Sequence, residues 1–317
     1  MHKLHMIIRG VSFGEFEGKI WVEWQKLQWI TFFLLKNTLP VDNTLPKNHY
    51  EAKNILCPVG MEYQKIHACP NDCILYRHEY AEIRNYPTCG VSRYKVNADK
   101  CSQDASTYKD RPSKVCWYLP VIPRLKRLFT NAEDAKNLTW HADGRIKDGL
   151  LHHPTDSPQW KTIDRLYPEF GQDPRNLRVG LASDGMNPYG NLSCNHSSWP
   201  ILLIIYNLPP WMCIKRKYIM MSMMIADPRQ VGNDIDVYLA PLIEDLRRLW
   251  VEGVDVYDGN AQETFRLHVL VFCTINDFPT YENLSGYSVK NIRLWTNAWG
   301  KVGVAPIKEK MIESCLW

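Results

Sequence analysis

The chain has 317 residues, of which 45% are hydrophobic and 23% charged, so it can bury a sizeable core and lacks the composition of a disordered protein. Its net charge of +4 permits nucleic-acid binding without predicting it. Because the first ten residues are followed by Glu15 and Glu17 rather than by an apolar core, we expect no signal peptide and an intracellular protein.

The N-terminal segment, residues 1–34, is expected to contain a short buried helix that carries several tryptophans. The apolar run at residues 29–35 is far below the length needed to span a bilayer. The later apolar runs, at residues 199–206 and 218–225, are also too short. We therefore expect no membrane partner.

Residues 35–130 contain a group of cysteines with metal-ligand spacing. Cys69 and Cys73 form a C-x3-C pair, and Cys89 precedes a glycine that permits a tight turn. Thiolates on short facing loops suit tetrahedral zinc, so we predict a zinc-ribbon-like module with these three cysteines as Zn²⁺ ligands. The alternative is a set of reduced thiols in packing positions. The candidates for a fourth ligand are His67, Cys101 and Cys116.

A segment at residues 109–145, which begins in this module, mixes basic and aromatic side chains in a way that suits contacts with phosphates. The competing interpretation is a solvated helix face whose leucines pack on the domain. Residues 131–175 are expected to be a linker, and we assign no role to its histidines, His141, His152 and His153. The residues predicted to bind nucleic acid are Arg111, Lys114, Arg124, Lys126 and Arg127.

Two strand-like runs each end close to an aspartate. Leu177, Val179 and Leu181 alternate with other residues in the period of a strand, and the run ends at Asp184. A β-branched and aromatic run at residues 264–276 ends at Asp277. Asp-Gly is also a common hairpin turn, so Asp184 taken alone could be a turn residue.

The elements between these aspartates predict a fold. Two strand-like runs are followed by an amphipathic helix within residues 234–253, which Pro241 is expected to shorten so that it begins near Ala240. The order is strand, strand, strand, helix, strand, and a crossover helix would return the last strand parallel to the first. We therefore predict a mixed α/β chain with a ribonuclease H-like β-β-β-α-β half-domain at residues 176–290, whose two aspartates share a metal ion.

A resemblance to the plant CACTA (En/Spm-type) transposases covers roughly residues 35–290. It is carried by the runs HACPNDCILYRHEY, DPRNLRVGLASDGMNPYGN, WPILLIIYNLPPWMC, GNDIDVYLAPLIEDLRRLW and TINDFPTYENLSGYS. The resemblance implies a nuclear, DDE-type, ribonuclease H-like transposase that cuts and rejoins DNA at the ends of its mobile element. Asp184 and Asp277 match the first two acids of that triad, and would hold Mg²⁺ or Mn²⁺ for two-metal phosphodiester chemistry.

The chain departs from this family at two places. Tyr86 stands where the family's C-P-x-C-G loop has its first cysteine, so one zinc ligand is missing. After Lys290 the tail, residues 291–317, no longer resembles the family, and nothing in the context of Glu309 or Glu313 supports either as the third acid. We therefore expect a truncated or rearranged transposase that is catalytically incomplete, with DNA as partner and a second copy or an accessory DNA-binding protein beside it.

Two other functions compete with this one. The first is a non-catalytic DNA-binding or interaction protein derived from a transposase, which would bind DNA without metal-dependent nicking. The second is a hydrolase of small molecules that uses Asp184 and Asp277. It is disfavoured because no Ser/His/Asp elbow or phosphate-binding glycine loop accompanies these acids.

Overall fold

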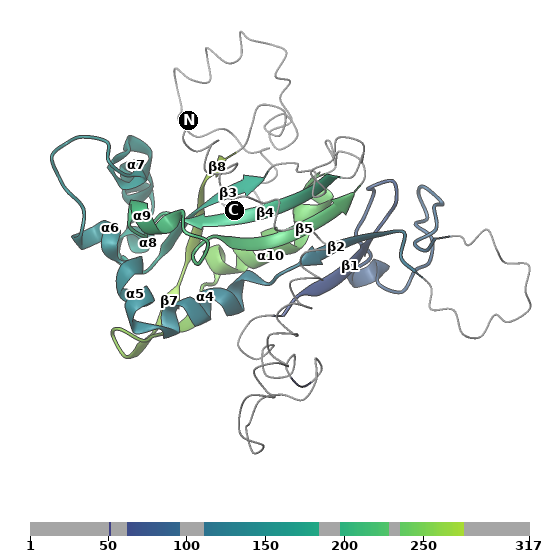
Figure 1. Cartoon of the computed structure of the whole chain (residues 1–317), viewed down its shortest axis with the longest axis horizontal. Coiled ribbons are helices and arrows are strands. Elements are labelled where there is room, and N and C mark those ends of the chain that lie inside the picture. The colour runs from purple at the N-terminus through teal and green to yellow at the C-terminus, as the bar shows by residue number, and fades with distance from the viewer. Residues whose placement is uncertain (1–50, 52–61, 96–110, 184–196, 228–234, 276–317) are drawn as a thin grey trace, which may run out of the picture.

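The computed structural model of the chain describes residues 51, 62–95, 111–183, 197–227 and 235–275 (Figure 1). The strands are β1 Gln64–Ala68, β2 Lys114–Tyr118, β3 Leu177–Ser183, β4 Ser197–Ile205, β5 Met220–Asp227, β6 Val254–Asp258, β7 Glu263–Leu267 and β8 Val269–Ile275. The helices are α4 Val121–Thr130, α5 Ala132–Leu138, α6 Trp140–Asp143, α7 Pro158–Leu166, α8 Pro168–Gln172, α9 Pro210–Cys213 and α10 Ile235–Val251, with 3-10 turns η3 His78–Tyr80 and η4 Pro154–Asp156.

A six-stranded sheet in the order β1-β2-β5-β4-β3-β8 forms the centre of the structure, and β6 and β7 form a separate hairpin (Figure 1). The strands pair antiparallel except for β3 and β8, which are parallel. The mixed α/β class is confirmed. Three antiparallel strands, β3, β4 and β5, are followed by α10, as predicted from the sequence. The β6–β7 hairpin then precedes β8, and β6 was not predicted.

The last predicted strand is divided in two. Residues 264–276 were expected to form one strand, but β7 ends at Leu267 and β8 begins at Val269. The residue between them, His268, donates its backbone N–H to Asn176 Oδ1 at 2.9 Å, and its carbonyl accepts from the Leu177 amide at 2.9 Å. These bonds fix the point where the chain leaves the β6–β7 hairpin and joins the main sheet.

Helix α10 is longer than predicted, because it begins at Ile235 and continues through Pro241. A proline inside a helix removes one hydrogen bond and crowds the carbonyl of the preceding turn, which costs about 3 kcal/mol. Burial of one whole side of the helix offsets this cost, at roughly 1.5–3 kcal/mol for each large apolar side chain. The buried residues of the helix are Ile235, Tyr238, Leu239, Pro241, Leu242, Leu246 and Leu249.

The cysteine-bearing segment and the β3–β8 segment share one sheet, because β2 pairs with β5 and places Cys116 opposite Ile225. Asp245 of α10 links the two segments. Its carboxylate accepts a hydrogen bond from the Tyr118 hydroxyl at 2.5 Å and another from the Val121 amide at 3.2 Å. The second bond satisfies a free N–H in the first turn of α4.

Residues 131–175, expected to be a linker, contain α5 to α8 and pack against β3. All seven residues of β3 are buried, so both faces of this strand are covered. On one face Trp160 of α7 and Phe170 of α8 lie over Arg178, a buried residue of β3. Within the described residues, none of the helices is both long and apolar enough to cross a membrane.

Candidate functional site

The ends of β3 and β8 lie side by side at one edge of the sheet. Their parallel register pairs Leu177 with Val269 at the start and Ala182 with Ile275 at the end. The predicted acids, Asp184 and Asp277, lie outside the described residues. The structure thus provides the position of the two strand ends that precede them in the sequence.

A β-bulge shapes β8 before this end. Val179 pairs with Val271, but the next residue of β3, Gly180, pairs with Cys273, so Phe272 is the extra residue. The Tyr206 ring crosses β3 at Gly180, where an added Cβ would lie 2.7 Å from the ring. A side chain at Gly180 would therefore displace Tyr206, which contacts the Phe272 ring and accepts a hydrogen bond from the Cys273 thiol.

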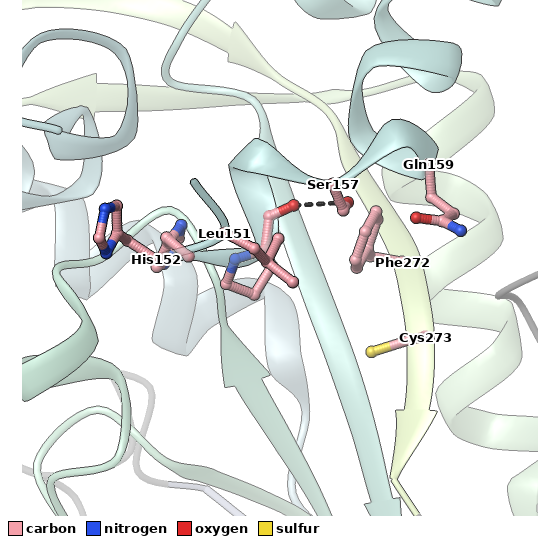
Figure 2. Close-up of a pocket in the computed structure, with 8 residues that line it drawn as sticks. Leu151, His152, Ser157, Gln159, Phe272 and Cys273 are labelled. Carbon is pink, nitrogen blue, oxygen red and sulfur yellow. Dashed lines mark hydrogen bonds between the residues drawn. The ribbon is translucent and has the colours of Figure 1, made fainter. Parts of the chain in front are cut away.

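A pocket of about 460 Å³ lies between this part of β8 and the segment from η4 to α7 (Figure 2). Burial lowers the pKa of His153 to about 4 and raises the pKa of Cys273 to about 11, so both groups are neutral near pH 7. The exposed His152 pairs with Asp148, which raises its pKa. The pocket thus has neutral groups at His153 and Cys273 and a histidine–aspartate pair at its rim. Its lining residues are Leu151, His152, His153, Pro154, Ser157, Gln159, Phe272 and Cys273.

The three predicted zinc ligands are brought together. The sulfur atoms of Cys69, Cys73 and Cys89 all lie within 4.8 Å of one another, and the Cys69–Cys89 pair is 3.5 Å apart. Tetrahedral Zn–S bonds near 2.3 Å imply sulfur separations of about 3.8 Å, so the cluster needs little adjustment to hold an ion.

Two tight turns produce this convergence. Asp72, with φ 60°, donates its amide to the Cys69 carbonyl at 3.0 Å, which closes the loop that carries Cys73. Gly90, with φ 67°, follows Cys89 and donates its amide to the Tyr86 carbonyl at 2.8 Å. The positive φ explains why glycine follows the last cysteine. The turns aim one thiol pair and one single thiol at the same point.

The predicted candidates for a fourth ligand do not join the cluster within the described part of the chain. His67 Nδ1 accepts a hydrogen bond from Arg93 Nε at 2.8 Å, and Cys116 is buried in β2 opposite Ile66. The third candidate, Cys101, lies outside the described residues.

Sequence reasoning missed Tyr76, which follows Cys73 by three residues. Burial raises the pKa of the Tyr76 phenol, and the thiols of Cys69, Cys89 and Cys73 raise it further. Tyr76 also follows Cys69 and Cys73 in the same hairpin, where its amide donates to the His67 carbonyl at 2.8 Å. The one hint in the sequence was that Tyr76 follows Cys69 and Cys73 closely enough to share their hairpin.

The residues predicted to bind nucleic acid have different surroundings. Lys114 is buried, with its ammonium paired to Asp72, and Arg124 donates to the Met221 carbonyl. These two cationic groups are therefore used inside the protein. The three exposed members of the set are Arg111, Lys126 and Arg127.

Residues 148–298 match the family model described as "Transposase family tnp2". The match includes β3, β4, β5, α10 and β8, together with the sequence positions of Asp184 and Asp277. No curated protein matches the chain. The match supports a transposase-derived protein, and with it DNA as the partner. It begins after the cysteine cluster, so the resemblance of residues 35–147 rests on the sequence motifs alone.

Proposed function

We propose that this chain is a transposase-derived nuclear protein in which a ribonuclease H-like sheet positions Asp184 and Asp277 to share one Mg²⁺ or Mn²⁺ ion. The parallel pairing of β3 with β8, up to Ala182 and Ile275, is the observation that carries the proposal. The carboxyl ends of parallel strands meet at the same edge of a sheet, where ligands commonly bind. Asp184 is the residue after β3, and Asp277 is the second residue after β8.

The strand order supports the ribonuclease H-like assignment. Among the four strands of this half-domain the spatial order is β5-β4-β3-β8, so the first strand in the chain lies beside the last. Helix α10 makes the crossover between β5 and the strands that follow it, and it packs against β8. The β6–β7 hairpin is an insertion between the crossover helix and the last strand.

The chemistry follows from the spacing of strands. Neighbouring strands lie about 4.8 Å apart, so acids that follow two adjacent ends can bring carboxylates within about 8 Å, close enough for one ion between them. Mg²⁺ prefers carboxylate oxygen. In phosphodiester cleavage such an ion stabilises charge on the attacking or leaving oxygen. The substrate is then the DNA at the ends of a mobile element.

The site is incomplete in this proposal, because two acids hold one ion firmly and leave a second ion weakly bound. Loss of chemistry would leave a protein that binds DNA without cutting it, which is the competing function. In either case a second copy of the chain or an accessory DNA-binding protein is the expected partner at the element ends.

Manganese binding by the full chain tests the shared ion. Electron paramagnetic resonance titration is expected to give one bound Mn²⁺ per chain at this site, with at least tenfold weaker binding in both Asp184→Asn and Asp277→Asn. Asp143→Asn, which changes an exposed acid at the end of α6, serves as the control and should bind as the original chain does. Weakening in one variant alone, or in neither, would refute a shared ion.

A further inference from the structure

Tyr76 is buried beside the cysteine cluster with an unsatisfied hydroxyl. The residue is 4% exposed, and its hydroxyl oxygen makes no hydrogen bond within the described residues. An unsatisfied buried hydroxyl costs about 1–3 kcal/mol, so such a group calls for a missing partner.

The surroundings of Tyr76 hold its ring in place. Its amide donates to the His67 carbonyl at 2.8 Å, in the hairpin that returns alongside β1. The Arg93 guanidinium lies 4.9 Å from the centre of the Tyr76 ring. Arg93 in turn donates to His67 Nδ1 at 2.8 Å and to the Ala81 carbonyl. The backbone hydrogen bond and the Arg93 guanidinium thus hold the ring in the hairpin that carries Cys69 and Cys73, and its buried hydroxyl makes no hydrogen bond to a thiol within the described residues.

The cluster offers three thiolates to an ion that favours four ligands. Tyr86, at the position of the expected cysteine, packs edge-on against Tyr80 with ring centres 5.7 Å apart. Its side chain is therefore used for packing. Cys69 is buried, Cys89 is half-buried and Cys73 is exposed, so one side of the cluster is open to solvent. Zinc sites with three protein ligands complete the tetrahedron with water.

We propose that Cys69, Cys73 and Cys89 bind one zinc-type ion whose fourth ligand is an exchangeable water, and that the Tyr76 hydroxyl hydrogen-bonds to this water. The ion would then supply the partner that Tyr76 lacks, and Tyr76 would position the water as outer-sphere groups orient the ligands of other zinc sites. An open fourth position distinguishes this site from a closed structural one. It could accept a small thiol or another soft donor in place of the water.

X-ray absorption spectroscopy on the full chain tests the ligand set. The purified chain should contain one zinc ion with three sulfur ligands near 2.3 Å and one oxygen near 2.0 Å. Cys101→Ser should leave this spectrum unchanged. A spectrum with four sulfurs that falls to three in Cys101→Ser would make Cys101 the fourth ligand and overturn the proposal, as would a chain without stoichiometric zinc.

The role of Tyr76 is tested with Tyr76→Phe, and Tyr80→Phe is the matched control from the same module. In competition with a chromophoric chelator, Tyr76→Phe should bind zinc 10- to 100-fold more weakly, the usual effect of losing an outer-sphere partner. The control should bind as tightly as the original chain.

A purely structural role for Tyr76 would give another pattern. Because phenylalanine removes an unsatisfied hydroxyl, the metal-free Tyr76→Phe chain should be as stable as the original or more so. A variant that loses stability without metal, or that keeps its full zinc affinity, would refute the water-positioning role. These outcomes are independent of the Asp184 and Asp277 site, which none of the variants changes.

Discussion

Ala182 of β3 lies directly opposite Ile275 of β8, in parallel register, one residue before β3 ends. The two strands therefore end side by side, at Ser183 and Ile275, on the same edge of the sheet. This relationship makes Asp184 and Asp277 candidates for one metal ion, although 93 positions separate them in the sequence. A site built on these two strand ends would have two acids, whereas two-metal phosphodiester chemistry needs more ligands.

The first prediction is that the purified chain does not cut DNA. Without a third acid the charge that develops on the leaving oxygen lacks compensation. Losing one electrostatic stabiliser commonly costs about 2.7–4 kcal/mol, or a hundred- to thousandfold in rate. Incubation with Mg²⁺ and a supercoiled plasmid carrying the element ends should give no nicked product. Nicking that Asp184→Asn abolishes would show that another residue or a partner subunit completes the site.

The second prediction concerns DNA binding by α4. Lys126 and Arg127 are exposed and within one turn, whereas Arg124 is held by the Met221 carbonyl. If each exposed group contacts a phosphate, Lys126→Ala and Arg127→Ala should each lower the slope of log K against log salt by about 1. Fluorescence anisotropy at several salt concentrations measures this slope. The control is Lys161→Ala, an exposed lysine of α7, which should leave the slope unchanged. If Lys126→Ala and Arg127→Ala keep the slope of the original chain, the DNA contacts lie elsewhere.

The third prediction concerns Arg178, a buried arginine of β3. Its guanidinium lies 4.2 Å from the centre of the Trp160 ring and 4.7 Å from that of Phe170, and it pairs with Asp164. The Asp164 side chain is 39% exposed, so water can solvate its carboxylate when the arginine is removed. The packing of Arg178 between the two rings should therefore contribute more to the stability of the fold than its ion pair with Asp164.

Two substitutions at Arg178 separate packing from charge. Arg178→Met keeps most of the volume and removes a buried Nε that lacks a hydrogen bond within the described residues, so it should cost less than about 1.5 kcal/mol. Arg178→Ala leaves a cavity and should cost about 3 kcal/mol. Urea unfolding measures both. Equal losses would mean that the charge, and not the packing, holds α7 and α8 on the sheet.

The sequence predicted the parts of the fold that depend on local pattern. β3, β4 and β5 were found because β-branched and apolar runs end at clear turn signals, and the parallel pairing of β8 followed from the order of elements. The same alternation could not show that Arg178 is buried, because α7 and α8 cover its face of β3 and periodicity carries no information about what packs on a strand.

The division of β7 from β8 could not be predicted for a similar reason. His268 is not a turn residue, and its position is fixed by Asn176, which lies 92 residues earlier in the chain. For the cysteine cluster, the spacing found Cys69, Cys73 and Cys89, because cysteines in short turns are a local signal. Tyr76 gave no signal, because its relation to the thiols depends on how the hairpin folds.

The last prediction concerns the pH dependence of stability and rests on two buried histidines. The sequence assigned no role to these histidines, and the structure buries two of them, His141 at 7% and His153 at 4% exposed. Burial lowers the pKa of each to about 4, and the nearby Arg178 guanidinium also lowers that of His141. In the unfolded chain the pKa of both returns to about 6.5.

Between pH 6.5 and pH 4 the unfolded state therefore binds more protons than the folded state, so stability falls as the pH falls through this range and is fully present above it. For pKa values of 6.5 and about 4, each histidine should lower the free energy of unfolding by about 2 kcal/mol on going from pH 7 to pH 5. His141→Gln should reduce this loss by about that amount in urea unfolding at the two pH values. His152→Gln is the control, since His152 is exposed and Asp148 raises its pKa, so its protonation does not oppose folding. A His141→Gln chain that loses as much stability at pH 5 as the original would mean that His141 remains charged and solvated in the folded state.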